Sequence, residues 1–323
     1  MKALLEKWGN LSPEQYSIEH IPVTPAFNDN VHTLQINNGK PNNLVMIHGF
    51  GGSGVIFYKY FKPLSEYYNI YAIDLRGAGL SGRSHIIESD VSKLETYYLD
   101  GVDKAIKSKI KGKFTLLGHS LGGYVAALYA HLHPDNIEKL YLLSPAGYSK
   151  LDPKKIDEFI DMFEHSSYTR KLAISCAVPF IAGELSPFLF LRYLGKSLAM
   201  KAINRYQNYI NMDNKEEAHD YVSFLYQMNL QDPCSDMHIG KILTLQGCGK
   251  TPLEERVVFS MPIHFIYGEK DWMNTDGAYK TKNACKYITI TIIPNVGHNL
   301  NIQAVDTIVA YITGDKKQIS IEI

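Results

Sequence analysis

Short apolar runs, separated by longer segments with helical spacing, are the main pattern along the chain. Runs of this length, bounded by Gly-rich or polar turns, are typical of strands buried in a parallel sheet. The expected strands are Leu44–Ile47, Ile70–Ile73, Thr115–Leu117, Leu140–Ser144, Ile263–Tyr267 and Ile288–Ile293. Val91–Ile110 and Leu121–Ala130 have the spacing or the small apolar residues of helices packed on a sheet. Strand and helix in alternation predict an α/β fold with a mainly parallel sheet flanked by helices.

The N-terminal part departs from this pattern. Residues 1–30 are mixed and are expected to end in an edge strand or loop. Val31–Ile36 alternates as a half-buried strand does, and the Asn37–Gly39 turn follows it.

The alternation stops between residues 149 and 257, where helical stretches rich in Phe, Tyr, Leu and Met replace it. We expect residues 1–148 and 258–323 to form the two parts of the α/β core and residues 149–257 to form an inserted helical cap. The apolar stretch 178–194 is interrupted by prolines and charged side chains, so it is too short to span a membrane. It fits a lid over the site, or the ordinary core of a helical subdomain.

Charge and cysteine content exclude several classes of protein. Lys plus Arg and Asp plus Glu both total 33, so no net positive field would hold nucleic acid. The four cysteines form no C-x-x-C pair, which argues against a zinc site or a disulfide framework and for reduced thiols. Charged residues interrupt Met1–Trp8 before a signal-peptide core can form, so we expect a cytoplasmic protein.

A Gly-x-Ser-x-Gly motif lies between an expected strand and an expected helix, with Ser120 flanked by Gly118 and Gly122. A serine on so sharp a turn needs glycine two residues before and after it, and its hydroxyl then projects into a cleft. The alternative is a Gly-rich turn with an ordinary serine, but the strand–helix context favours a nucleophile. The helix N-terminus would place the Leu121 N–H where an oxyanion forms.

A second Gly-rich loop, residues 48–52, follows the Leu44–Ile47 strand. Its Phe50 N–H is the expected second oxyanion donor, because neither a phosphate-binding nor a dinucleotide-binding motif is present. His48 is expected to anchor the loop rather than to react. Asp74 and Arg76, in the loop after the next strand, are expected to pair with each other and to pin that loop.

Two more candidate residues follow the last two expected strands. Asp271 comes just after Ile263–Tyr267, and His298 follows Ile288–Ile293. Open α/β sheets place their active sites at this carboxyl edge, so Ser120, Asp271 and His298 are expected to meet there. We expect His298 to be the general base and Asp271 to orient it, with Asp276 as a less suitable spare acid. The alternative for His298 is a capping histidine.

These motifs resemble the α/β-hydrolase superfamily over nearly the whole chain. Within it, three segments are similar to the lipid-acting subfamily of α/β-hydrolase domain proteins four and five: Tyr226–Gln231, Thr251–Leu253 and Tyr267–Asn274. Members of that subfamily are described as phospholipases, lysophospholipid or N-acyl-phosphatidylethanolamine lipases and lysophosphatidic acid acyltransferases; one lacks the serine and acts as a lipase coactivator. The subfamily often has Asp five residues after the catalytic histidine, whereas this chain has Gln303, which weakens the acyltransferase reading.

The sequence therefore predicts a serine hydrolase that cleaves carboxylic esters of phospholipids or lysophospholipids without a cofactor or metal. The alternatives are a small-ester hydrolase or prolyl aminopeptidase-like enzyme, a lysophospholipid acyltransferase, and a non-catalytic lipid-binding regulator. Apolar cap residues such as Phe180, Phe188 and Phe190 are expected to contact a membrane or lipid droplet peripherally. The sequence does not predict an oligomeric state.

Overall fold

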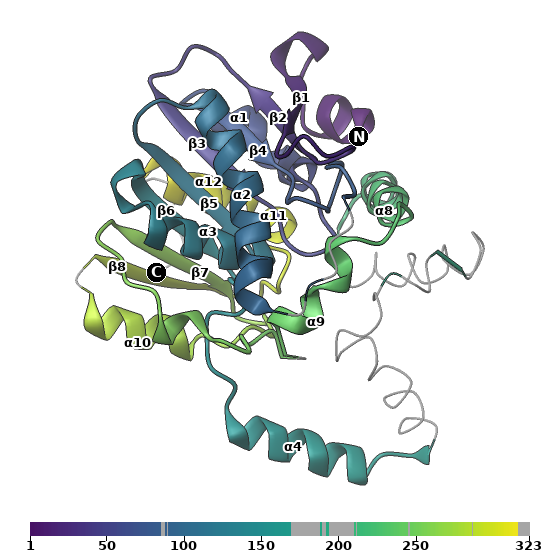
Figure 1. Cartoon of the computed structure of the whole chain (residues 1–323), viewed down its shortest axis with the longest axis vertical. Helices are drawn as coiled ribbons and strands as arrows, with labels where there is room; N and C mark the ends of the chain where they lie inside the picture. The colour runs from purple at the N-terminus through teal and green to yellow at the C-terminus, as the bar shows by residue number, and fades with distance from the viewer. Residues whose placement is uncertain are drawn as a thin grey trace.

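The protein is built around one twisted sheet with helices on both faces (Figure 1). The computed structural model describes residues 1–84, 88, 90–168, 188, 192–193, 210, 212–244, 246–285 and 287–315. In these residues eight strands form the sheet in the order β1-β2-β4-β3-β5-β6-β7-β8. The strands are β1 Ser17–Pro22, β2 Asn30–Ile36, β3 Asn42–Ile47, β4 Tyr68–Ile73, β5 Phe114–His119, β6 Ile137–Leu143, β7 Ile263–Gly268 and β8 Ile288–Ile293.

The sheet is parallel from β4 to β8, and β2 runs antiparallel to both β1 and β4. The α-helices are α1 Tyr58–Leu64, α2 Val91–Lys109, α3 Leu121–Leu132, α4 Pro153–Glu164, α8 Lys215–Asn229, α9 Ile239–Ile242, α10 Asp276–Ala284, α11 Leu300–Gln303 and α12 Val305–Thr313. Short 3₁₀ or π turns are η1 Ala3–Trp8, η2 Pro13–Gln15, η3 Gly54–Phe57, η4 Pro134–Asn136, η5 Ser235–Met237 and η6 Leu253–Glu255. This architecture confirms the predicted α/β fold with a mainly parallel sheet flanked by helices.

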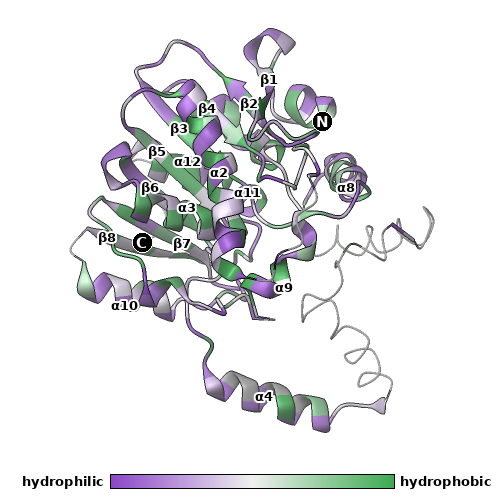
Figure 2. Ribbon diagram, viewed as in Figure 1, coloured by the Kyte–Doolittle hydropathy of each residue, from purple (hydrophilic) through white to green (hydrophobic). Residues whose placement is uncertain are grey.

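Alternate residues of each central strand pack into two different apolar layers. On β5, Leu116 belongs to the layer beneath α2 and α3, and Leu117 belongs to the layer beneath α1 and α12. Figure 2 shows the central strands and α3 as largely hydrophobic. Both faces of the sheet are therefore buried, which explains why these strands read as continuous apolar runs.

The N-terminal segment differs from its prediction in one respect. β2 is almost fully buried rather than half-buried. Its Leu34 belongs to the same apolar layer as Leu4 and Leu5 of η1, and both η3 and α2 pack against the strand. The leading residues also supply β1, the expected edge strand, so β2 becomes an interior strand of the sheet.

Two of the described cap helices, α4 and α8, differ in their contacts with the core. In Figure 1, α4 stands apart from the sheet, and α8 lies beside the N-terminal segment. Trp8 Nε1 donates to Asp220 Oδ2 at 2.8 Å, and Lys59 pairs with Glu217 at 2.9 Å, so polar contacts fix α8 to the core. The predicted cap boundaries remain a prediction, because most of residues 169–209, with Phe180 and Phe190, lie outside the described residues.

The turn between β5 and α3 holds Ser120 at φ 55° and ψ −119°, a backbone conformation that residues other than glycine rarely adopt. A Cβ on Gly118 would lie 2.3 Å from the carbonyl oxygen of Gly122, and a Cβ on Gly122 would lie 2.2 Å from that of Ile47. Both glycines are thus required by close backbone contacts, as the motif predicted.

Gly122→Ala should therefore destabilise the fold strongly. Its new methyl group meets the β3 backbone, which cannot move without disturbing the sheet, and we expect a loss of about 3 kcal/mol or more in the free energy of unfolding. The matched control is Gly39→Ala. Gly39 has φ +67°, and no atom would lie within 4 Å of the added carbon. This variant should lose only about 1 kcal/mol from backbone strain. Urea unfolding followed by circular dichroism measures both, and equal losses would contradict this explanation.

Candidate functional site

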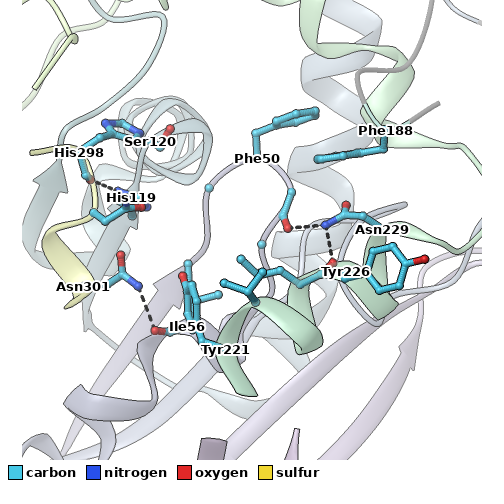
Figure 3. Close-up of a pocket in the computed structure, with 16 residues that line it drawn as sticks. Phe50, Ile56, His119, Ser120, Phe188, Tyr221, Tyr226, Asn229, His298 and Asn301 are labelled. Carbon is cyan, nitrogen blue, oxygen red and sulfur yellow. Dashed lines mark hydrogen bonds between the residues drawn. The ribbon is translucent and has the colours of Figure 1, made fainter. Parts of the chain in front are cut away.

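A cavity of about 360 Å³ lies at the carboxyl edge of the sheet (Figure 3). Its walls come from the loop after β3, the Ser120 turn, α8 and the segment after β8. The lining residues are Gly49, Phe50, Gly51, Gly52, Ile56, His119, Ser120, Phe188, Tyr221, Val222, Leu225, Tyr226, Asn229, His298, Asn299 and Asn301. None of them carries a permanent charge, so the cavity suits an uncharged and mainly apolar group.

Ser120, Asp271 and His298 come together at this cavity. Ser120 and His298 both line it, and Figure 3 shows their side chains close to each other. His298 Nδ1 lies 3.0 Å and 3.1 Å from the two carboxylate oxygens of Asp271. Since a carboxylate only accepts, Nδ1–H is the donor and His298 Nε2 carries the lone pair. Asp276 instead begins α10, where its N–H donates to Asn274.

The carboxylate of Asp271 is buried behind His298, with 1% of its side chain exposed. Burial acts to raise the pKa of Asp271, but the contacts with His298 and the Met273 N–H together outweigh burial, and the pKa lies below its ordinary value. Met273 N–H also donates to Asp271 at 3.1 Å. Asp271 is therefore ionised at neutral pH and holds His298 in one tautomer and one orientation.

Two aromatic side chains that the sequence reasoning did not single out contact His298. The ring of Trp272 lies 5.1 Å from the imidazole, and that of His119 lies 5.0 Å from it. His119 Nε2 donates to the His298 carbonyl oxygen at 2.9 Å, and burial lowers the pKa of His119 to about 3. His119 is thus a neutral brace for the loop that carries His298. Its position between Gly118 and Ser120 is the feature of the sequence that could have identified it as a site residue.

The Phe50 N–H belongs to the Gly-rich loop after β3, which lines the cavity. The carbonyl oxygen of Gly49 accepts from Gly52 N–H at 3.1 Å and lies 2.7 Å from His48 Nδ1. The carbonyl and N–H of one planar peptide point in opposite directions, so Phe50 N–H faces away from both donors. Neither Phe50 N–H nor Leu121 N–H has an acceptor among the described residues. Both predicted oxyanion donors are therefore available to a ligand.

His48 anchors this loop, as predicted. Its Nε2 accepts from Leu75 N–H at 3.0 Å, which makes Nδ1 the protonated nitrogen that donates to Gly49. The side chain is fully buried, and burial lowers the pKa of His48, so it remains neutral and keeps both bonds.

The predicted pairing of Asp74 with Arg76 is wrong. Asp74 accepts from Ser53 Oγ, Gly54 N–H and Leu80 N–H at 2.9, 2.6 and 2.7 Å. Arg76 instead forms a bidentate pair with Asp29 at 2.7 and 2.5 Å. Asp29 lies just before β2, which the antiparallel pairing of β2 with β4 brings beside Arg76. Both side chains do pin loops, but the partner of Arg76 is remote in sequence.

Two cap residues touch the same Gly-rich loop. Asn229 Nδ2, at the end of α8, donates to the Gly51 carbonyl oxygen at 2.9 Å and to that of Leu225 at 2.8 Å. The ring of Phe188 stacks on Phe50 with centroids 5.1 Å apart and planes 12° apart. Phe188 is therefore part of the cavity wall, and its predicted contact with a membrane stays a prediction. Figure 3 shows both contacts.

In the described ranges, no group of three or more His, Cys, Asp or Glu side chains is placed to hold a metal ion. Nor do those ranges contain a helix whose length and apolar character would let it cross a bilayer. Cys234, Cys248 and Cys285 are free thiols, and Cys176 lies outside the described residues.

Relatives of the chain include proteins whose names refer to lipids. It is 27% identical over 269 residues to a probable 1-acylglycerol-3-phosphate O-acyltransferase of Oryza sativa, covering 79% of this chain and 62% of the rice protein. It is 26% identical to a human (lyso)-N-acylphosphatidylethanolamine lipase, covering 84% and 74% of the two chains. The chain thus spans about three fifths of the length of the rice relative.

Solved structures and a family model agree on the fold. The 2-hydroxy-6-oxo-6-phenylhexa-2,4-dienoate hydrolase of Rhodococcus sp. strain RHA1 superposes with a TM-score of 0.65 at 13% identity, covering 93% of this chain and 98% of that one. The model of the α/β-hydrolase fold matches residues 42–305. This range contains the Gly-rich loop, the Ser120 turn, Asp271 and His298. The chain therefore belongs to the α/β-hydrolase fold family.

Proposed function

We propose that the protein is a serine hydrolase that cleaves carboxylic esters through an acyl-enzyme intermediate. The observation that carries this proposal is the joint placement of Ser120 and His298 on one cavity, with His298 Nδ1 bonded to the buried carboxylate of Asp271. An uncharged imidazole nitrogen beside a serine hydroxyl is the arrangement that activates serine as a nucleophile.

In the proposed reaction, Ser120 Oγ attacks the ester carbonyl carbon and His298 Nε2 takes the hydroxyl proton. The carbonyl oxygen becomes an oxyanion, which accepts hydrogen bonds from Phe50 N–H and Leu121 N–H. His298 then gives the proton to the leaving alcohol. Water, deprotonated by His298, attacks the acyl-enzyme and releases the carboxylic acid and Ser120. Asp271 stays ionised and stabilises the imidazolium in both steps.

The substrate class that we propose is a phospholipid or lysophospholipid ester. Apolar side chains from α8 and from the Gly-rich loop face the cavity, so it can bury an acyl chain. The names of the rice and human relatives both concern lipid substrates, which supports this choice over a small ester.

Acyl transfer differs from hydrolysis only in that an alcohol replaces water as the acceptor. The rice relative's name gives a reason to test it. Where the resembling subfamily often has Asp, Gln303 accepts from Gly297 N–H at 2.7 Å and donates to the Ile210 carbonyl at 3.1 Å. It braces the loop before His298 instead of offering a carboxylate. Labelled acyl donor with excess lysolipid distinguishes the two reactions by their products.

Ser120→Ala should abolish ester hydrolysis, because no other group on the cavity is proposed to attack the carbonyl. We expect kcat to fall on the order of 10⁴-fold or more. The same variant should lose labelling by a fluorophosphonate probe, whereas Ser108→Ala, on the far α2 helix, should keep both. A folded wild-type protein that does not label would favour a non-catalytic lipid-binding regulator.

Asn229→Asp should lower kcat more than it raises KM. The carboxylate cannot donate to Gly51 and repels its carbonyl oxygen, so the Gly-rich loop loses one of the contacts that hold it and, with it, the Phe50 N–H. Loss of one oxyanion donor costs about 10²- to 10³-fold in kcat, and a misplaced donor should cost about tenfold or more. Gln227→Glu makes the same amide-to-acid change at an exposed position of α8. If the two variants had equal kinetic constants and equal melting temperatures, the proposed role of Asn229 in the site would be wrong.

Activity on soluble 4-nitrophenyl esters should increase with acyl length. Each buried CH₂ contributes about 0.8 kcal/mol, or about fourfold in kcat/KM, until the cavity is filled. Val222→Trp narrows this cavity from α8 and should lower activity on decanoate far more than on acetate. A wild-type preference for acetate or butyrate, or an equal loss on both esters, would support the small-ester hydrolase.

A further inference from the structure

A second, smaller cavity lies on the other side of the Phe50–Phe188 pair. Its volume is about 20 Å³, and Phe50, Phe188 and Asn229 line both cavities. It also reaches Leu121, the other proposed oxyanion donor. The Phe50–Phe188 stack therefore divides the region next to Ser120 into a large apolar compartment and a small compartment of different chemistry.

The small compartment contains a buried donor without a partner. Arg83 donates one terminal N–H to the Gly79 carbonyl oxygen at 2.9 Å, but its buried Nε–H has no acceptor in the described parts of the chain. A buried N–H without an acceptor is unfavourable, so this position selects for an oxygen atom. A volume of about 20 Å³ holds one water molecule or one oxygen of a larger ligand.

The charges around this compartment favour an anion. Arg83 and Arg192 line it together with one carboxylate, that of Asp236. Arg192 donates to Asp236 at 2.8 Å and to the Gln231 carbonyl at 2.8 Å, so its own charge is balanced. Burial lowers the pKa of the Arg83 guanidinium and the carboxylates of Asp236 and Asp74 oppose this, but an arginine remains charged at neutral pH. Among the described residues, two guanidinium groups and one carboxylate line the compartment itself, and guanidinium N–H groups are strong donors to phosphate oxygens.

We propose that Arg83 and Arg192 form a subsite for the phosphate group of a glycerophospholipid substrate, with one phosphoryl oxygen accepting from Arg83 Nε–H. This inference rests on the proposed hydrolase function and extends it to the alcohol side of the ester. The acyl chain lies in the large cavity, the ester carbonyl lies at Ser120, and the short glycerol backbone passes the edge of Phe50. The phosphate then reaches the arginines, since none of the described residues that line the large cavity is cationic.

The experiment compares two lipids that differ only in the phosphate: oleoyl lysophosphatidic acid and oleoylglycerol, in the same neutral detergent micelles. The quantity measured is the ratio of their kcat/KM values. Wild type should prefer the phosphate lipid, and Arg83→Gln should lower the ratio at least about tenfold, as expected for a charged hydrogen bond. Arg83→Lys, which keeps the charge without the Nε donor, should be intermediate.

Matched variants separate this effect from general electrostatics and from misfolding. Lys150→Gln removes an exposed cation that lines neither cavity and should not alter the ratio. If Arg83→Gln fails to fold, Arg192→Gln tests the same subsite from the cap. An unchanged ratio in both folded arginine variants would overturn the proposal and leave an ordered water as the occupant of the small cavity.

Free phosphate in solution is tested as an alternative ligand of this subsite. If inorganic phosphate or glycerol 3-phosphate inhibits oleoylglycerol cleavage through Arg83, and the ratio for the two lipids does not depend on Arg83, the site binds free phosphate and the lipid subsite is wrong. Equilibrium binding of both lipids to Ser120→Ala, with and without Arg83→Gln, needs no turnover. If the wild-type protein shows no esterase activity but its binding of lysophosphatidic acid depends on Arg83, the proposed hydrolase function is wrong. The proposed phosphate subsite would then still be supported.

Discussion

The close approach of three glycines around Ser120 is the constraint on which the site depends. Gly118 and Gly122 let α3 cross directly over the ends of β5 and β3, and Gly49 leaves only 2.9 Å between its hypothetical Cβ and that of Ser120. These contacts hold Ser120 in its strained conformation because neither α3 nor the Gly-rich loop can move away. The same contacts bring the start of α3 and the Phe50 peptide to one point, so nucleophile and oxyanion donors are fixed together.

Around this centre, three histidines have different hydrogen-bond partners. His48 orients the Gly49–Phe50 peptide, His119 holds the backbone of His298, and His298 is the one of the three that bonds a carboxylate. Burial keeps the first two uncharged. The site therefore contains one imidazole suited to exchange a proton and two that act as fixed hydrogen-bonding groups.

The strands and the residues at their carboxyl ends could be predicted because each depends on a local pattern. An apolar run predicts a buried strand, and the parallel sheet then brings Ser120, Asp271 and His298 to one edge. Contacts between distant segments could not be found in this way. The Asp29 partner of Arg76 depends on β2 pairing with β4, and the Asn229 contact with Gly51 depends on how α8 packs on the core. The burial of β2 likewise depends on η3 and α2, which pack against it from other parts of the chain.

The hydrogen bond from Asn229 to Gly51 also links the shape of the cavity to its chemistry. Part of the wall of the large cavity belongs to α8, so any outward movement of this helix that widens the cavity must break that bond. The widened form would then lack one of the bonds that hold the Gly-rich loop, while His48 and the Gly52 N–H still hold the Gly49–Phe50 peptide. One amide side chain on α8 thus couples the width of the acyl compartment to the position of the loop beside Ser120.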